Sequence, residues 1–293
     1  MNIQFQTNLL SKKLDKNIKL FCFGYGLTAK YLIKKLSDKK LNFSFVGTSR
    51  KKEKLGKNLL YFDQNDFDSN ILKEIKTSTH ILISSPPPSE EYILKNFLEC
   101  INASSVEWIG YLSATSVYGN HKGEWVNENS ICKPTFENGI KRIEAEKKVS
   151  KLKNYRIFRL SGIYSEERNI FSRLKNNEVK ILDNPNQIFS RIHIEDIAEA
   201  LYLSFEKSEI GDVFNLSDDY PCSYAEVVQY ACDLLKINLP ETIKLENIKS
   251  EMMKSFYLDK KKVSNKKIKE KLGIKLKFPD YKSGLLSIFN NIY

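Results

Sequence analysis

The sequence has 293 residues, of which 41% are hydrophobic and 12% aromatic, a composition typical of a folded chain with a substantial core. The formal net charge of +11 comes from lysines scattered along the chain, without a basic segment interleaved with aromatic residues, so we expect no nucleic-acid partner. The densest lysine run, over residues 260–277, is interpreted as a solvated helix face. No apolar run approaches membrane-spanning length, and residues 1–16 lack the pattern of a secretory signal, which predicts no membrane association and a cytoplasmic location. The five cysteines and three histidines have no metal-ligand spacing, so no metal site is expected.

Predicted strands and helices alternate through the first half of the chain. Strands are expected over residues 18–23, 42–47, 58–63, 79–85, 108–113 and 155–160, with helices over 29–36, 68–75, 90–104 and 138–151 between them. Beyond residue 160 we expect a helix over 196–205, a short strand over 213–216 and an amphipathic helix over 223–235. This order predicts an α/β fold with a doubly wound parallel sheet and a small C-terminal lobe.

The turn after the first strand has the spacing of a dinucleotide-binding motif. The apolar run leads into Gly24-Tyr25-Gly26-Leu27-Thr28-Ala29, which reads G-x-G-x-x-A, and a helical pattern follows. The first glycine allows a tight turn, the second lets a pyrophosphate approach the backbone, and the small third residue lets the helix pack on the strand. The helix N-terminus offers unpaired N–H groups to the phosphates. We therefore predict cofactor contacts at Gly24, Tyr25, Gly26, Leu27 and Thr28.

The end of the second strand indicates which dinucleotide binds. An NAD site usually places a carboxylate about twenty residues past the glycines, where it binds the ribose 2′-hydroxyl. Here the strand ends in Thr48-Ser49-Arg50, without Asp or Glu. A guanidinium can pair in bidentate fashion with a 2′-phosphate, which a carboxylate would repel. The sequence favours NADP, with Thr48, Ser49 and Arg50 as contacts, and leaves NAD as the alternative.

Ligands of a doubly wound sheet bind beyond the carboxyl ends of its strands. The residues at these ends are therefore further candidates for cofactor contacts: Asp63 after the third strand, Ser84, Ser85 and Pro86 after the fourth, and Ser161 after the sixth.

From Ile18 to its C-terminus the chain resembles an extended short-chain dehydrogenase/reductase, of the atypical branch similar to nucleoside-diphosphate-sugar epimerases. The segments that carry the resemblance follow the glycine turn in the family's order: Gly47–Arg50, Leu112–Gly119, Arg159–Tyr164, Arg191–Ala198 and Phe214–Pro221. The resemblance implies a Rossmann domain that binds NAD(P), over residues 17–160 and 188–217. It also implies a substrate-binding lobe over residues 161–187 and 218–293.

The family's chemistry uses a Tyr-x-x-x-Lys helix, in which the tyrosine moves a proton while hydride passes to or from the nicotinamide. The resemblance places the end of this helix at Ala145-Glu146. Counting back, the tyrosine position falls on Asn138 and the lysine position on Arg142. An amide is no phenolic acid, and a guanidinium hardly gives up a proton, but Arg142 could bind the cofactor ribose or a phosphate.

The family also uses a Ser or Thr that hydrogen-bonds the reacting oxygen. Counted back from Tyr118, this position falls on Ala114, between Ser113 and Thr115. The resemblance therefore assigns the catalytic positions to Ser113, Thr115, Asn138 and Arg142.

Two functions are compatible with these residues. The first is an epimerase- or dehydratase-like oxidoreductase that acts on a sugar nucleotide or another small hydroxyl or carbonyl compound, with Tyr118 or Tyr164 as alternative acids. The second is a non-catalytic NADP(H)-binding redox sensor or partner-binding module on the same fold. His193 is interpreted as a structural histidine. Neither the substrate nor the oligomeric state follows from the sequence.

Overall fold

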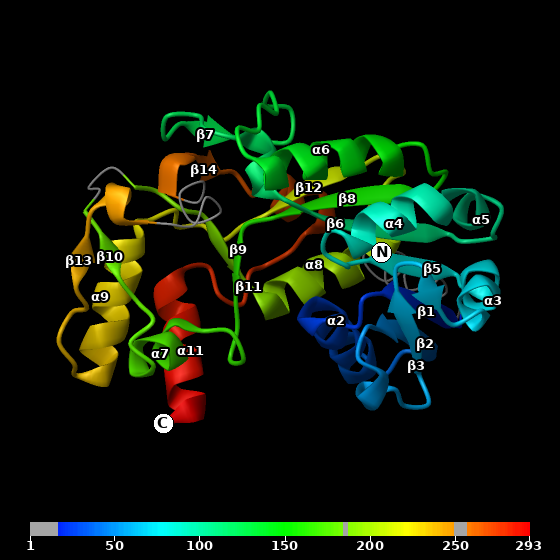
Figure 1. Ribbon diagram of the computed structural model, residues 1–293, viewed down its shortest axis with the longest axis horizontal. Coiled ribbons are helices and arrows are strands. Elements are labelled where there is room, and N and C mark those ends of the chain that lie inside the picture. Colours follow the sequence, from blue (N-terminus) through cyan, green and yellow to red (C-terminus); the bar gives the residue numbers. More distant parts are fainter. Residues whose placement is uncertain (1–16, 184–186, 249–256) are drawn as a thin grey trace, which may run out of the picture. The chain divides into compact units, whose positions relative to one another are not determined.

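The computed structural model describes residues 17–183, 187–248 and 257–293. Its largest sheet has eight strands in the order β12-β8-β6-β5-β1-β2-β3-β4 (Figure 1). The bounds of these strands, in chain order, are β1 Ile18–Phe23, β2 Phe43–Ser49, β3 Leu59–Asp63, β4 Asp66–Phe67, β5 His80–Ile83, β6 Trp108–Ala114, β8 Tyr155–Leu160 and β12 Val213–Leu216.

The sheet reverses its strand order at β1. Strand β1 pairs in parallel with β2 on one side and with β5 on the other, and only the short β4 is described as antiparallel, to β3. The chain thus runs outward through β2 and β3, and then returns past β1 to β5 and β6. Helices connect successive strands: α2 Leu27–Asp38, α3 Asn70–Thr77, α4 Ser89–Asn96, α5 Leu98–Asn102, α6 Glu137–Val149 and α8 Ile194–Lys207. The predicted fold class, a doubly wound α/β sheet, is confirmed.

Backbone contacts divide the chain into two compact units. The first contains the residues up to Leu112 with Lys147–Ile157 and Ser204–Asp212, and the second contains Ser113–Glu146, Phe158–Leu203 and Val213–Tyr293. These contacts do not show which residues bind a cofactor and which bind a substrate. The predicted cofactor-binding and substrate-binding domains therefore stay predictions.

In the first unit, the helix predicted over residues 90–104 is divided at Phe97. The backbone of this residue, at φ −112° and ψ −6°, departs from ideal helix dihedrals between α4 and α5. Its buried ring lies 5.3 Å from that of Phe67 and 5.6 Å from that of Phe23, measured between ring centroids. Burial of a large aromatic ring outweighs the small gain from continuing a helix by one turn.

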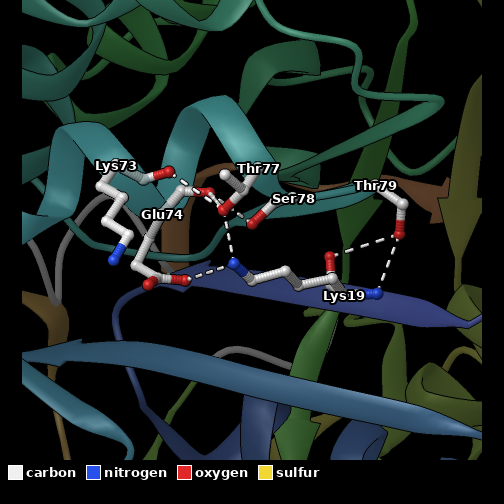
Figure 2. Close-up of polar contacts among 6 residues, drawn as sticks. All are labelled: Lys19, Lys73, Glu74, Thr77, Ser78 and Thr79. Carbon is white, nitrogen blue, oxygen red and sulfur yellow. Dashed lines mark hydrogen bonds and ion pairs between the residues drawn. The ribbon is translucent and has the colours of Figure 1, made fainter.

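A polar cluster joins α3 to the start of β1, at the opposite end of that strand from the glycine turn (Figure 2). The Lys19 ammonium forms an ion pair with Glu74 at 3.1 Å and a hydrogen bond with the Thr77 hydroxyl. The Lys19 backbone N–H donates to the Thr79 hydroxyl at 2.9 Å. These contacts fix one helix on the sheet and leave the other end of β1 for ligands.

In the second unit, helices α7 Ile170–Lys175, α9 Tyr224–Leu235 and α11 Tyr281–Ile292 surround a hydrophobic core that includes Phe171, Val228 and Leu285. Ser223 begins α9 with a capping box in which its hydroxyl and the Glu226 carboxylate each accept a backbone N–H. Three small parallel pairs complete this unit: β9 Gly162–Tyr164 with β11 Arg191–His193, β10 Ile181–Leu182 with β13 Thr242–Ile243, and β7 Trp125–Val126 with β14 Lys262–Val263. It also contains the short 3₁₀ helices η2 Thr115–Tyr118 and η3 Leu245–Asn247 and the π-helix η4 Ile268–Leu272, whereas the 3₁₀ helix η1 Lys52–Lys54 lies in the first unit.

Candidate functional site

The glycine turn between β1 and α2 is held by both neighbouring strands. Gly24 has a φ of +91°, a conformation that favours glycine. Its N–H donates to the Thr48 hydroxyl at 2.8 Å, and its carbonyl accepts from the Ser84 hydroxyl, also at 2.8 Å. The Tyr25 N–H donates to the Thr48 carbonyl at 2.8 Å. The turn is therefore fixed by the strand ends that the sequence predicts around the cofactor.

The space beside Gly26 fits a pyrophosphate. A Cβ built on Gly26 would have no atom within 4 Å, whereas one on Gly24 would lie 2.9 Å from the Ser85 Oγ. Gly26 is also the N-cap of α2, where no side chain caps the helix and no acidic residue occupies the first turn. Open space, unpaired N–H groups and the positive end of the helix dipole together suit a phosphate.

The predicted contacts within the turn differ in their accessibility. Tyr25 is half-buried, and its ring stacks on that of Phe45 at a centroid distance of 5.7 Å. Leu27 is half-buried and Thr28 is buried.

At the end of β2, the three predicted contacts have different environments. Thr48 is only 3% exposed and its hydroxyl accepts from Gly24, so it supports the turn. The Ser49 hydroxyl accepts the Lys51 N–H at 3.1 Å. Arg50 is exposed, and within the described part of the chain its guanidinium has no ion pair. Arg50 is thus an exposed cation directly after β2, at the position where the sequence predicts a contact with a 2′-phosphate.

The remaining strand-end candidates lie on both sides of the turn. Asp63 is exposed at the end of β3, Ser85 is buried against Gly24, and Pro86 is exposed after β5.

The second unit contains a cavity of about 250 Å³. Its wall combines hydroxyl groups, one ion pair and apolar side chains, contributed by Ala114, Thr115, Ser116, Leu160, Ser161, Gly162, Ile188, Phe189, Ser190, Asp259, Lys261 and Val263. Two predicted residues, Thr115 and Ser161, therefore meet here. Ala114 provides only a methyl group at the position where the family's Ser or Thr is expected.

The other predicted catalytic residues lie elsewhere in this unit. Asn138 is exposed and Arg142 half-buried on α6, and neither lines the cavity. Ser113 is buried, and its hydroxyl donates to the Glu146 carboxylate at 2.6 Å.

Glu146 belongs to a buried polar network that the sequence did not reveal. Its carboxylate accepts two hydrogen bonds from the Arg159 guanidinium, at 2.7 and 3.1 Å. Arg159 also donates to the Tyr118 hydroxyl at 3.0 Å, and this hydroxyl donates to Asn215 Oδ1 at 2.7 Å. Burial raises the pKa of Tyr118 to about 12 against the opposing effect of Arg159. The Tyr118 hydroxyl is thus committed to the network and poorly suited to acid–base chemistry near pH 7.

Tyr164 and His193 also have structural surroundings. Burial raises the pKa of Tyr164, and its ring packs edge-on against His193 at a centroid distance of 5.1 Å. Burial lowers the pKa of His193 to about 4, and its Nδ1 accepts the Glu195 N–H at 3.3 Å. A histidine that stays neutral at pH 7 fits the structural interpretation.

The sequence analysis missed the ion pair in the cavity wall. Lys261 belongs to the lysine run interpreted as a solvated helix face, and this interpretation is wrong for Lys261, which is 8% exposed beside the strand β14. The structure shows the alternating burial of a strand at Lys261, Lys262 and Val263. The sequence hides this alternation because residues 260–262 are all lysine.

No group of three metal-ligating side chains occurs among the described residues. Within the same ranges, no helix is long and apolar enough to cross a membrane.

Comparison with known proteins shows which solved structures and curated proteins this chain resembles. No family model matches the sequence. The structure of a functionally unknown conserved protein from Silicibacter pomeroyi has a TM-score of 0.83 and 34% identity, with 93% of this chain and 98% of that chain covered. A dTDP-D-glucose 4,6-dehydratase from Dictyostelium discoideum is 25% identical over 177 residues, 55% of this chain but only 38% of that protein.

Two more distant structures share the fold. The UDP-glucuronic acid 4-epimerase of Bacillus cereus, in complex with UDP-glucuronic acid and NAD, has a TM-score of 0.74 at 14% identity, covering 94% of this chain and all (100%) of that chain. A human epimerase family protein with NADPH has a TM-score of 0.72, with the same identity of 14% and the same coverage of 94% and 100%. The chain therefore shares the fold of structures described as NAD-dependent epimerases and dehydratases, in agreement with the resemblance that the sequence indicates.

Proposed function

We propose that the protein binds a nicotinamide dinucleotide and acts as an epimerase- or dehydratase-like oxidoreductase. Its substrate would be a sugar nucleotide or another small compound with a hydroxyl or carbonyl group. The observation that carries this proposal is the open, uncapped N-terminus of α2 beside Gly26. The complexes of the related folds with NAD, NADPH and UDP-glucuronic acid support it.

Each element of the turn has a defined part in this function. The backbone N–H groups at the start of α2 would bind the pyrophosphate, while Thr48 and Ser84 hold Gly24 in place. When bound, the nicotinamide supplies hydride chemistry. Thr115 and Ser161 would contact the substrate in the cavity of the second unit.

We further propose that NADP(H) binds better than NAD(H), because the exposed Arg50 can pair with a 2′-phosphate. Arg50→Ala should weaken NADPH binding by about one to two decades, the loss expected for a charge-assisted hydrogen bond, and leave NADH binding nearly unchanged. Calorimetric titration measures both affinities. Lys51→Ala removes the same charge from the adjacent exposed residue and is the matched control. Equal affinity of the wild type for NADPH and NADH would refute the preference.

A non-catalytic NADP(H)-binding sensor or partner-binding module is the second candidate. It is favoured by the methyl group of Ala114, the amide of Asn138 and the buried, hydrogen-bonded hydroxyl of Tyr118. Turnover of a panel of sugar nucleotides at saturating NADP or NAD separates the two functions. Turnover abolished by Asn138→Ala assigns the reaction to Asn138, whereas tight NADPH binding without turnover of any substrate supports the sensor.

A further inference from the structure

A larger cavity lies elsewhere in the second unit, where helices α7, α9 and α11 pack around their common core (Figure 1). Its lining comes from the C-terminal ends of these three helices and from the turns after α7 and α9, and it shares no residue with the cavity lined by Thr115 and Ser161. Its volume is about 720 Å³. Small-molecule sites in proteins have volumes of about 300–1,000 Å³. This cavity is therefore large enough for a whole small ligand.

Most of the cavity wall is apolar, and part of this apolar surface is open to solvent. Ile237 and Tyr293, both in the lining, are 45% and 52% exposed. The ring of Tyr293 packs on that of Phe289, with centroids 5.1 Å apart. The other apolar side chains of the wall are Leu174, Leu234 and Leu235. Isolated exposed hydrophobic residues are ordinary, but several in one concave surface indicate a place for an apolar ligand.

Two cations in the same wall determine the charge that a ligand should carry. The lining contains Lys175 and Lys236 and no acidic side chain. Within the described part of the chain, neither ammonium group forms an ion pair. Lys175 Nζ lies 4.1 Å from the centroid of the Tyr293 ring, so this cation is held beside the apolar surface. The wall thus combines an apolar surface with two positive charges that are free to bind an anion.

The negative ends of the three helix dipoles do not cancel these charges. Each helix end carries about −0.5 of an elementary charge, so three ends carry about −1.5 against the +2 of the two lysines. Carbonyls at these ends are also already paired. The Leu174 carbonyl accepts the Asn177 N–H at 3.1 Å, and the Phe289 carbonyl accepts the Tyr293 N–H at 3.0 Å. The remaining positive charge suits a ligand with a single anionic group.

We propose that this cavity binds a monocarboxylate with an extended apolar body. The apolar body lies against Leu235, Ile237 and Phe289, and the carboxylate is bound by the ammonium groups of Lys175 and Lys236, whose flexible stems can follow it. This site goes beyond the proposed function, because a nicotinamide dinucleotide and a sugar nucleotide are polar over their whole length.

The charge requirement is tested by calorimetry with three probes: decanoate, 1-decanol and acetate. The wild type should bind decanoate at least fivefold tighter than 1-decanol, because two partly exposed ammonium groups add to the apolar contacts, and should not measurably bind acetate. In the double variant Lys175→Gln/Lys236→Gln the advantage of decanoate over 1-decanol should fall below about twofold. The control Lys244→Gln changes an exposed lysine outside the cavity wall and should keep the full advantage.

The apolar requirement is tested with Ile237→Asp, which should weaken the binding of both decanoate and 1-decanol at least tenfold. Its control is Leu286→Asp, at a residue that is 43% exposed and outside the wall, which should bind both probes as the wild type does. All substituted side chains are exposed, and the melting temperature measured by circular dichroism verifies that each variant is folded.

Four results would overturn the proposal. The first three are no binding of decanoate to the wild type, equal affinity for decanoate and 1-decanol, and an unchanged advantage of decanoate in the double lysine variant. The fourth is a dimer in sedimentation equilibrium that Ile237→Asp abolishes, since the apolar wall would then be covered by a second copy of the chain. NADPH binding is measured on the same proteins and should not change, because none of the substituted residues belongs to the glycine turn.

Discussion

Removing the Glu146 carboxylate should destabilise the protein strongly. Both side chains of the Glu146–Arg159 pair are only 8% exposed, and the Ser113 hydroxyl donates to the same carboxylate. Glu146→Ala would leave a buried guanidinium and a buried hydroxyl without their acceptor. Breaking a buried ion pair by removing one partner costs about 3–5 kcal/mol. At about 2–4 °C per kcal/mol for a chain of this size, the melting temperature should fall by about 6–20 °C.

Urea unfolding followed by circular dichroism measures this loss. The control is Glu144→Ala on the exposed side of the same helix, which should change the free energy of unfolding by less than about 0.5 kcal/mol. The double variant Glu146→Leu/Arg159→Met should recover part of the loss, since no unpaired charge then remains buried. If the free energy of unfolding of Glu146→Ala lies within about 1 kcal/mol of that of the control, the Glu146–Arg159 pair does not stabilise the fold as a buried ion pair.

Three further predictions concern separate parts of the molecule. Gly26→Val should weaken NADPH and NADH binding at least tenfold in calorimetry and cost less than about 1 kcal/mol of stability, because its Cβ meets no protein atom; normal binding would contradict the phosphate placement. Lys19→Met should lower the free energy of unfolding in urea by about 1 kcal/mol, and this loss should be smaller at high salt because the Lys19–Glu74 pair is partly exposed (Figure 2). The control Lys73→Met, on the exposed face of α3, should not change the free energy of unfolding measurably. His193 has a folded pKa of about 4, below its unfolded value of 6.5, so it stabilises the fold above pH 6.5 and this contribution is lost as the pH falls toward 4. The free energy of unfolding, measured by urea titration at pH values between 7 and 4, should therefore fall more for the wild type than for His193→Phe, by up to about 3 kcal/mol. The same pH dependence in both proteins would contradict a lowered pKa of His193.

The sheet and its glycine turn could be predicted because their signals are local. Apolar strands alternate with amphipathic helices, and the G-x-G-x-x-A spacing stands directly between a strand and a helix. The division of a helix at Phe97 could not be predicted, because it depends on rings contributed by distant strands.

For two of the predicted site residues the structure shows a role that the sequence did not reveal. The hydroxyls of Thr48 and Ser84 hold Gly24, while their contacts with a cofactor stay predictions. This role depends on strand register, which aligns Cys22 with Gly47 and Phe23 with Ile83, and register is not visible in the separate segments. Lys261 was missed because it belongs to a run of lysines directly before β14, and only the structure shows that its side chain is buried.

The interleaving of the two units has a consequence for biosynthesis. The chain passes from one unit to the other after Leu112, Glu146, Ile157, Leu203 and Asp212. At about 5–20 residues per second, the ribosome needs about 5–20 s to extend the chain from Leu112 to Asp212, and only then are all segments of the first unit present. During this interval the segments that follow Leu112 are not yet available to pack against β6. Its side chains, which are buried in the folded protein, then stay exposed and can be bound by chaperones. A truncation at Leu112 should accordingly yield an aggregation-prone fragment rather than an isolated cofactor-binding domain.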